Sequence, residues 1–210
     1  GLDIVSLGEL KKARMVKVDP QKIVFASVGK TKEEIVEAIN DRILFFNVES
    51  LPELERINEI AKSMGKVASA AIRINPDVQA PTHDFITTGT LKKKFGIDLK
   101  TTRHIFKSRK KYANVNINGV HIHIGSQITS GKPFVGAIKK TIEFINELKA
   151  EGIYIEYLDI GGGLGIIYKD EKPQTAQQYA DLVLPILKGT GLKIIMEPGR
   201  FIVGNAGIFV

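Results

Sequence analysis

The chain has 210 residues and a mass of 23.1 kDa, with 43% hydrophobic and 25% charged residues, which excludes a mini-protein and a wholly disordered chain and favours one large domain. It has no cysteine, so disulfides, thiolate metal ligands and cysteine nucleophiles are excluded. The net charge of +7 is carried partly by Lys92 to Lys94 and by Lys107, Arg109, Lys110 and Lys111. Because no nucleic-acid-binding motif accompanies them, we interpret these residues as a solvated surface and expect no nucleic-acid partner.

The sequence has no run of about 18 apolar residues and no pattern of a secretory signal, so we expect a cytoplasmic protein without a membrane segment. Short apolar runs rich in β-branched residues predict seven strands, which in chain order lie at 4–5, 23–26, 43–48, 68–74, 115–124, 153–160 and 192–196. Segments with helical periodicity lie between several of them, at 31–40, 52–64, 132–150 and 176–187. Strands that alternate with helices predict a parallel sheet covered by helices.

Seven strands in this length give about 30 residues per unit, close to that of a (β/α)8 barrel. We therefore predict an α/β fold, a TIM-type barrel with about seven of its eight strands in this chain. The alternative is a doubly wound open sheet that binds a dinucleotide. Such a sheet carries the dinucleotide-binding motif Gly-x-Gly-x-x-Gly after its first strand. The glycine-rich turn at 161–166 argues against it, because Ile166 occupies the position of the third glycine. The same turn has no Gly-Lys-Ser/Thr, which excludes a P-loop.

In such a barrel the chemistry lies at the carboxyl ends of the strands, and alternate residues face the lumen. Arg73 and Asn75 share one face of their strand, and His121 and His123 share one face of theirs, with isoleucines on the opposite faces. We predict that these polar faces line the lumen. Further lumen candidates near strand ends are Asp3, Asp159 and Glu197.

Each candidate also has a structural interpretation. His121 and His123 could ligate a metal, but no carboxylate or third histidine lies nearby in the sequence, so we expect no metal and interpret His121 as a satisfied core histidine. Arg73 is either a buried ion-pair partner or a functional residue. The glycines at 161–163 form either a simple tight turn or a nest of backbone N–H groups suited to phosphate.

The charges of the lumen candidates do not balance. Asp3, Asp159 and Glu197 carry three negative charges, and Arg73 supplies one positive charge. Because buried unpaired carboxylates are costly, the site requires a cationic partner. A ligand with a protonated ring nitrogen and an iminium would meet this requirement.

Several segments resemble one family, in its order and at its spacing across essentially the whole chain. They are 3–6, 8–10, 46–50, 73–76, 94–96, 121–127, 159–163 and 197–200. They are similar to the diaminopimelate decarboxylases, within the alanine-racemase-like, fold-type III pyridoxal-phosphate (PLP) enzymes that also include ornithine and arginine decarboxylases. Residues 124–127 and the pairs Thr82-His83 and Thr88-Gly89 resemble the diaminopimelate branch more than the ornithine branch.

The resemblance implies PLP as cofactor and the decarboxylation of meso-diaminopimelate, an amino acid, to L-lysine by a homodimer. By the same resemblance, His123 would stack on the cofactor ring and Glu197 would hold the protonated pyridine nitrogen. The phosphate would be held by Gly161, Gly162, Gly163, Ser126 and Arg200. A charged network that orients His123 would consist of Asp3, Glu9 and Arg73.

The resemblance also implies departures. The family's Schiff-base lysine belongs to a strand upstream of the segment matched by Gly1 to Asp3, and residues 1–210 contain neither that motif nor the family's C-terminal β domain. We therefore expect a fragment of the PLP-binding barrel whose edges at 3–6 and 192–203 are unpaired or filled by a second copy of the chain. We expect it to keep its phosphate site but to release no carbon dioxide alone. The alternatives are a non-catalytic or regulatory homologue, and a related decarboxylase acting on arginine or carboxynorspermidine.

Overall fold

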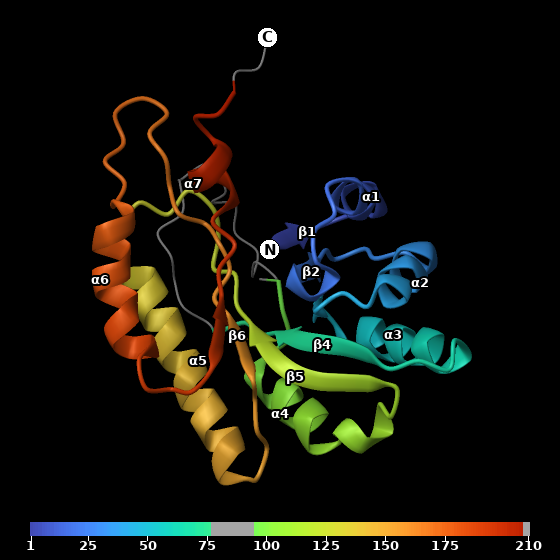
Figure 1. Cartoon of the computed structure of the whole chain (residues 1–210). Coiled ribbons are helices and arrows are strands. Elements are labelled where there is room, and N and C mark those ends of the chain that lie inside the picture. The colour runs from blue at the N-terminus through green and yellow to red at the C-terminus, as the bar shows by residue number, and fades with distance from the viewer. Residues whose placement is uncertain (77–94, 208–210) are drawn as a thin grey trace, which may run out of the picture.

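Seven parallel strands, adjacent in chain order, form one curled sheet with helices on its outer side (Figure 1). The computed structural model describes residues 1–76 and 95–207, so Lys92 to Lys94, Thr82-His83 and Thr88-Gly89 lie outside the described residues. The strands are β1 (Leu2–Ile4), β2 (Ile23–Ala26), β3 (Phe45–Val48), β4 (Ala68–Arg73), β5 (Val115–His121), β6 (Tyr157–Asp159) and β7 (Lys193–Ile195). Within the described residues β1 pairs only with β2, and β7 only with β6. The predicted incomplete barrel is confirmed.

The helices of the described ranges are α1 (Leu7–Met15), α2 (Lys32–Asp41), α3 (Leu51–Ser63), α4 (Leu99–Lys107), α5 (Lys132–Ala150), α6 (Ala176–Leu187) and α7 (Gly199–Val203), with 3-10 turns η1 (Pro20–Lys22) and η3 (Arg109–Lys111). All four predicted helices are confirmed. The expected edge at 3–6 is wrong beyond Ile4, because Ser6 already caps α1. The expected edge at 192–203 is wrong beyond Ile195, because Gly199 N donates to Glu197 O and the chain turns into α7. None of these helices has the length and apolar character that crossing a bilayer requires.

Side-chain caps begin the helices close behind the strands that precede them. Ser50 accepts a hydrogen bond from Glu53 N and caps α3 two residues after β3 ends. Thr31 forms a reciprocal capping box with Glu34 at the start of α2. Because such caps satisfy backbone N–H groups at the helix start, the turns at the carboxyl ends of the strands are held by local hydrogen bonds.

Apolar residues lie on both sides of the sheet. The large core between sheet and helices includes Phe25 and Phe46, whose rings stack at 6.1 Å. A small second cluster comprises Val24, Phe45 and Ala71, with Leu44, Tyr157 and Ile195 packed against it. By strand alternation this second cluster lies on the concave side, since its residues neighbour members of the large core along the same strands.

The second cluster forms an apolar floor below the polar residues of the concave side. Asn47, Arg73, Asp159 and Glu197 each come two residues after one of its members, and so share that member's face. Arg73, Asp159 and Glu197 therefore lie on the face that the sequence pattern predicts for them. Side chains at the carboxyl ends of four strands, β3, β4, β6 and β7, converge over this floor.

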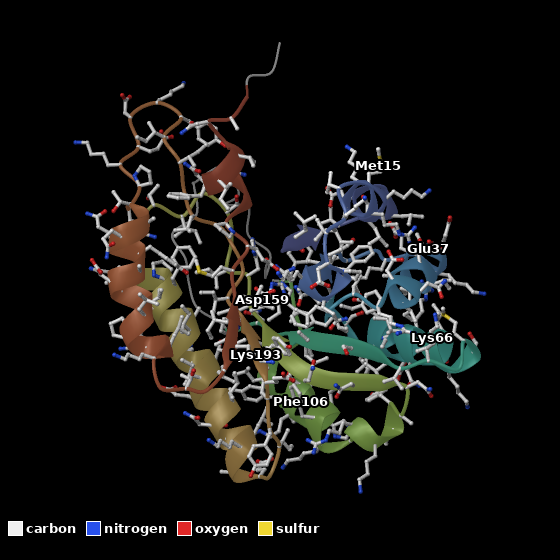
Figure 2. All side chains as sticks on the ribbon, viewed as in Figure 1. Met15, Glu37, Lys66, Phe106, Asp159 and Lys193 are labelled. Carbon is white, nitrogen blue, oxygen red and sulfur yellow. The ribbon has the colours of Figure 1, made fainter. Side chains whose placement is uncertain are left out.

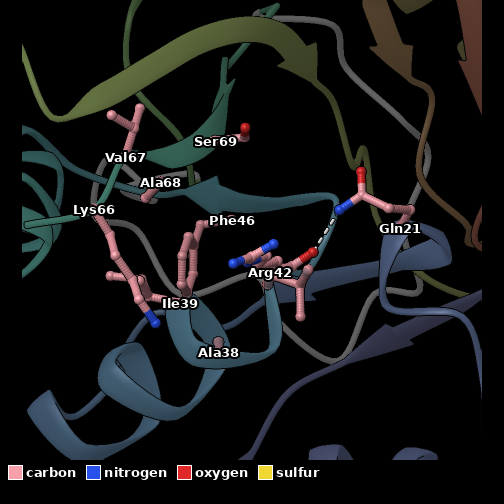
Figure 3. Close-up of a pocket in the computed structure, with 10 residues that line it drawn as sticks. Gln21, Ala38, Ile39, Arg42, Phe46, Lys66, Val67, Ala68 and Ser69 are labelled. Carbon is pink, nitrogen blue, oxygen red and sulfur yellow. Dashed lines mark hydrogen bonds between the residues drawn. The ribbon is translucent and has the colours of Figure 1, made fainter. Parts of the chain in front are cut away.

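A hollow of about 280 Å³ lies at the opposite end of the strands (Figure 3). Two of its polar lining side chains already have partners, since Gln21 Nε2 donates to Arg42 O at 2.5 Å and Lys66 Nζ donates to Asn40 Oδ1 at 2.6 Å. In barrels of this type that end serves stability rather than chemistry. The candidate site is therefore at the carboxyl ends.

Replacing Leu54 by alanine should destabilise the fold, because Leu54 is fully buried between α3 and the sheet. We expect a loss of about 2–5 kcal/mol in the free energy of unfolding, measured by urea denaturation. Met15, which is 80% exposed, supplies the control, and Met15→Ala should change stability by less than about 0.5 kcal/mol. Equal effects of the two substitutions would contradict this packing.

Candidate functional site

Three ionisable side chains from neighbouring strands meet on the concave side. His121 ends β5, Asp159 ends β6 and Glu197 follows β7, and ligand atoms of the three lie within 4.8 Å of one another. His121 and Asp159 are buried, at 1% and 0% exposure. Figure 2 labels Asp159 on the inner side of the curled sheet. One nitrogen and two carboxylates are ligands that a divalent cation can take, although the sequence led us to expect no metal.

Asn47 joins the two carboxylates of this group. Its Nδ2 donates to Asp159 Oδ2 and to Glu197 Oε1, each at 3.2 Å, across 112 and 150 residues of sequence. Gly161 N donates to Asp159 Oδ1 at 2.9 Å. The two acids are thus fixed by one amide on β3 and one backbone N–H after β6.

The two carboxyl groups differ in protonation. Burial raises the pKa of Asp159 to about 7, with the charge of Glu197 adding to the rise and His121 opposing it. Burial would also raise the pKa of Glu197, but its contact with His121 above all holds that pKa well below its usual range. At neutral pH Glu197 is therefore fully ionised, whereas Asp159 is only partly ionised.

His121 lies against both acids. Its Nε2 is 3.6 Å from Glu197 Oε2. Burial favours the neutral ring, yet Glu197 and Asp159 together raise the pKa of His121 above its ordinary value. Neither ring nitrogen has a hydrogen-bond partner within the part of the chain that the structure describes. His121 is therefore a buried core histidine as expected, but the interpretation that it is satisfied is wrong, because neither ring nitrogen has a hydrogen-bond partner among the described residues and the Glu197 carboxylate lies at ion-pair distance.

His123 has a different environment, with 32% of its side chain exposed to the concave side. Its Nδ1 accepts a hydrogen bond from Gly162 N at 3.3 Å. A ring nitrogen that accepts carries no proton, so the proton of this ring resides on Nε2. Arg73 Nη2 holds the carbonyl oxygen of His123 at 3.4 Å.

Arg73 belongs to a chain of buried ion pairs. Its Nη1 donates to Glu49 Oε1 at 2.5 Å, and Glu49 N donates to Glu53 Oε2 at 2.8 Å. Lys30, which is 4% exposed, pairs with Glu53 Oε1 at 2.7 Å. Sequence reasoning assigned no role to Lys30, Asn47 or Glu49. The parity rule could have found Asn47 and Glu49, because they alternate with the buried Phe46 and Val48.

Asp3 and Glu9 lie near the open edge. Asp3 is exposed on β1. Its pKa is raised, first by desolvation among the surrounding protein atoms and then by the charges of Glu197 and Asp159. Glu9 accepts a hydrogen bond from Val5 N at 2.7 Å. Within the described residues Arg73 pairs with Glu49 rather than with either of them. A role of Asp3 and Glu9 in orienting His123 stays a prediction.

The glycine turn after β6 is bound to the loop after β5. Gly161 and Gly163 have left-handed φ values of +67° and +94°. Ile128 N donates to Gly163 O at 2.8 Å. A Cβ on Gly162 would collide with the carbonyl oxygen of Glu197, so this position requires glycine.

This turn differs from the expected nest of three donors. Gly161 N–H is engaged by Asp159 and Gly162 N–H by His123, so two of the three groups orient side chains of the site. Ser126 and Arg200 are exposed beside it, and Arg200 Nη1 lies 3.5 Å from Gln127 Oε1. Gly163, Ser126 and Arg200 remain as candidates for direct phosphate contact.

The basic stretch noted in the sequence lies elsewhere. Lys107, Arg109, Lys110 and Lys111 are exposed at the end of α4 and in η3, and Lys107 pairs with Glu151 at 3.1 Å. The interpretation of this stretch as solvated surface agrees with this placement. It contributes no charge to the concave site.

Comparisons with known proteins agree with this architecture. The family model described as pyridoxal-dependent decarboxylase, pyridoxal binding domain, matches residues 1–204. Diaminopimelate decarboxylases of Aquifex aeolicus and Vibrio cholerae are 48% and 44% identical over 100% of this chain, and it covers 50% and 51% of their lengths. The chain thus spans about half the length of these curated relatives.

Among solved structures, diaminopimelate decarboxylase from Helicobacter pylori complexed with L-lysine matches with a TM-score of 0.87 and 42% identity. The match covers 95% of this chain and 51% of that one. The resemblance drawn from the sequence motifs is confirmed by these relatives. The chain belongs to the pyridoxal-binding-domain family of the pyridoxal-dependent decarboxylases.

Proposed function

We propose that this chain is the PLP-binding barrel part of a decarboxylase that converts meso-diaminopimelate to L-lysine, acting in the whole protein as a homodimer. The observation that carries the proposal is the buried group of Glu197, Asp159 and His121 on a barrel whose relatives are diaminopimelate decarboxylases. The reaction removes one carboxylate as carbon dioxide and puts a proton in its place. The bound cofactor would supply the electron sink that this bond cleavage requires.

The residues of the site fit this cofactor. Glu197 brings a negative charge to the site beside Asp159, and Arg73 does not balance it, because Arg73 is already paired with Glu49. A protonated ring nitrogen supplies a positive charge at that place. Buried polar atoms without partners in the described residues, Asn47 Oδ1 and Arg73 Nε among them, also indicate a site suited to a polar ligand.

Each residue then has a physical task in the proposal. Glu197 holds the proton of the ring nitrogen, and Asn47 fixes the orientation of its carboxylate. His123 presents its ring to the cofactor, because Gly162 N–H and the Arg73 contact to its carbonyl hold it in place. Gly163, Ser126 and Arg200 bind the phosphate.

Gly162→Ala should weaken PLP binding roughly tenfold or more, about 1.4 kcal/mol, because the added Cβ displaces the loop that carries Glu197. Binding is measured by calorimetry or by cofactor fluorescence. Gly29→Ala is the matched control, since a Cβ there meets no atom within 4 Å and its affinity should stay unchanged. Equal affinity of both variants would remove the glycine turn from the site.

Arg200→Ala should lower the affinity for PLP by about 10- to 100-fold and leave that for pyridoxal, which has no phosphate, nearly unchanged. The exposed Arg109 supplies the control variant, Arg109→Ala. Comparing the two ligands separates a phosphate contact from a general loss of fold. A parallel loss for both ligands would count against a phosphate role.

Carbon dioxide release from meso-diaminopimelate by the whole protein tests the substrate. We expect release with this substrate and none with arginine or carboxynorspermidine. The chain of 210 residues alone should release none above a control with PLP only. Cofactor binding by the whole protein without release from any of the three would favour a non-catalytic homologue.

A further inference from the structure

We infer that His121 is a positioning residue for Glu197, a buried imidazolium that keeps this carboxylate ionised and in place, while the neighbouring His123 is neutral. The inference rests on the proposed function, in which Glu197 meets the ring nitrogen of the cofactor. The two histidines at the end of β5 therefore have different roles. His121 places a positive charge beside Glu197, and His123 presents the face of its ring to the cofactor.

Geometry places His121 at the centre of the negative charges. Its Nε2 is 3.6 Å from Glu197 Oε2, and the two side chains are 1% and 7% exposed. Asp159 on β6 lies in the same group of ligand atoms. Because water is excluded on both sides, the attraction between ring and carboxylate is screened weakly.

The other charged groups around His121 do not take over this role. Arg73 on β4 is paired with Glu49 at 2.5 Å, and Lys30 is paired with Glu53 at 2.7 Å. Asp3 on β1 adds a third carboxylate near His121, and Asn47 on β3 is neutral. Among the described residues facing Glu197, His121 is therefore the buried basic side chain that can balance the negative charge of Glu197.

His123 is excluded from this role by its hydrogen bond. Its Nδ1 is 3.8 Å from Glu197 Oε2, a little farther than the 3.6 Å of His121. The same Nδ1 accepts the proton of Gly162 N–H at 3.3 Å. One ring nitrogen cannot accept that proton and donate another to Glu197, so His123 is held as the Nε2–H tautomer.

The first experiment reads the two rings directly. The chain without cofactor, labelled with nitrogen-15 in its four histidines, is examined at pH 7 by long-range proton–nitrogen NMR. His121→Gln and His123→Gln assign the signals. We expect both nitrogens of His121 to be protonated and only Nε2 of His123. A neutral His121 at pH 7 would overturn the inference.

The second experiment removes the proposed partner. In Glu197→Gln we expect His121 to titrate at least one pH unit lower than in the unmodified chain. Glu156→Gln is the matched control, because Glu156 is an exposed carboxylate just before β6 that pairs with Lys193 at 2.7 Å. The control should leave His121 unchanged. An equal shift in both variants, or none in Glu197→Gln, would also overturn the inference.

Stability of the cofactor-free chain provides a third readout. A histidine whose pKa is raised on folding stabilises the folded state fully at pH values below its unfolded pKa of 6.5. This stabilisation is lost as the pH rises through the pKa of the folded state. Asp159, raised from 3.8 to about 7, acts in the same direction between these values. The free energy of unfolding should fall from pH 6 to pH 8, and less steeply in His121→Gln than in the exposed control His104→Gln.

Cofactor binding separates this inference from the proposed function. We expect His121→Gln to bind PLP at least tenfold more weakly than His104→Gln, and nitrogen-15 in the cofactor ring to report a less protonated ring nitrogen. If the whole protein binds no PLP but His121 of this chain is an imidazolium that depends on Glu197, the proposed function fails and the His121–Glu197 pair stands. If PLP binds equally well to His121→Gln with an unchanged ring signal, the positioning role is refuted and the proposed function stands.

Discussion

The interaction on which the concave site depends is the fixation of the buried Glu197 carboxylate. Asn47 reaches it from β3, His121 from β5, and Gly162 packs against its carbonyl. These partners stabilise the charge that burial alone would disfavour. Because they come from separate strand units, the carboxylate keeps its place only when the sheet is curled.

Asn47 connects this acid group to a second charged network. Its carbonyl oxygen accepts a hydrogen bond from Lys30 at 2.8 Å, while its side chain donates to both acids. Lys30 in turn pairs with Glu53, whose other oxygen accepts from Glu49 N. Through Glu49 and Arg73 this network reaches the carbonyl of His123. Asn47 of β3 thus links the group of buried acids to the network that holds His123 in place.

The glycine turn after β6 illustrates how a sequence motif can serve more than one purpose. Consecutive glycines suggest a phosphate nest, yet the first two N–H groups orient Asp159 and His123. Glycine is required there for another reason as well, because a Cβ on Gly161 or Gly162 would collide with the backbone of neighbouring loops. Gly161 and Gly162 therefore position Asp159 and His123, and Gly163 lies beside the loop that contains Ser126.

The sequence by itself determined the seven strand units, four of the helices and the face on which the polar residues lie. Periodicity and caps act locally, and so the predicted bounds of α5 and α6 agree with the structure. The polar helix α4, capped by Asp98, was not predicted, because its apolar positions are few. Only the tertiary structure decided the pairing of Arg73 with Glu49, the bridge from Asn47 to acids more than 100 residues away, and the unequal protonation of Asp159 and Glu197. These depend on distances and burial between strands, which no local pattern of residues specifies.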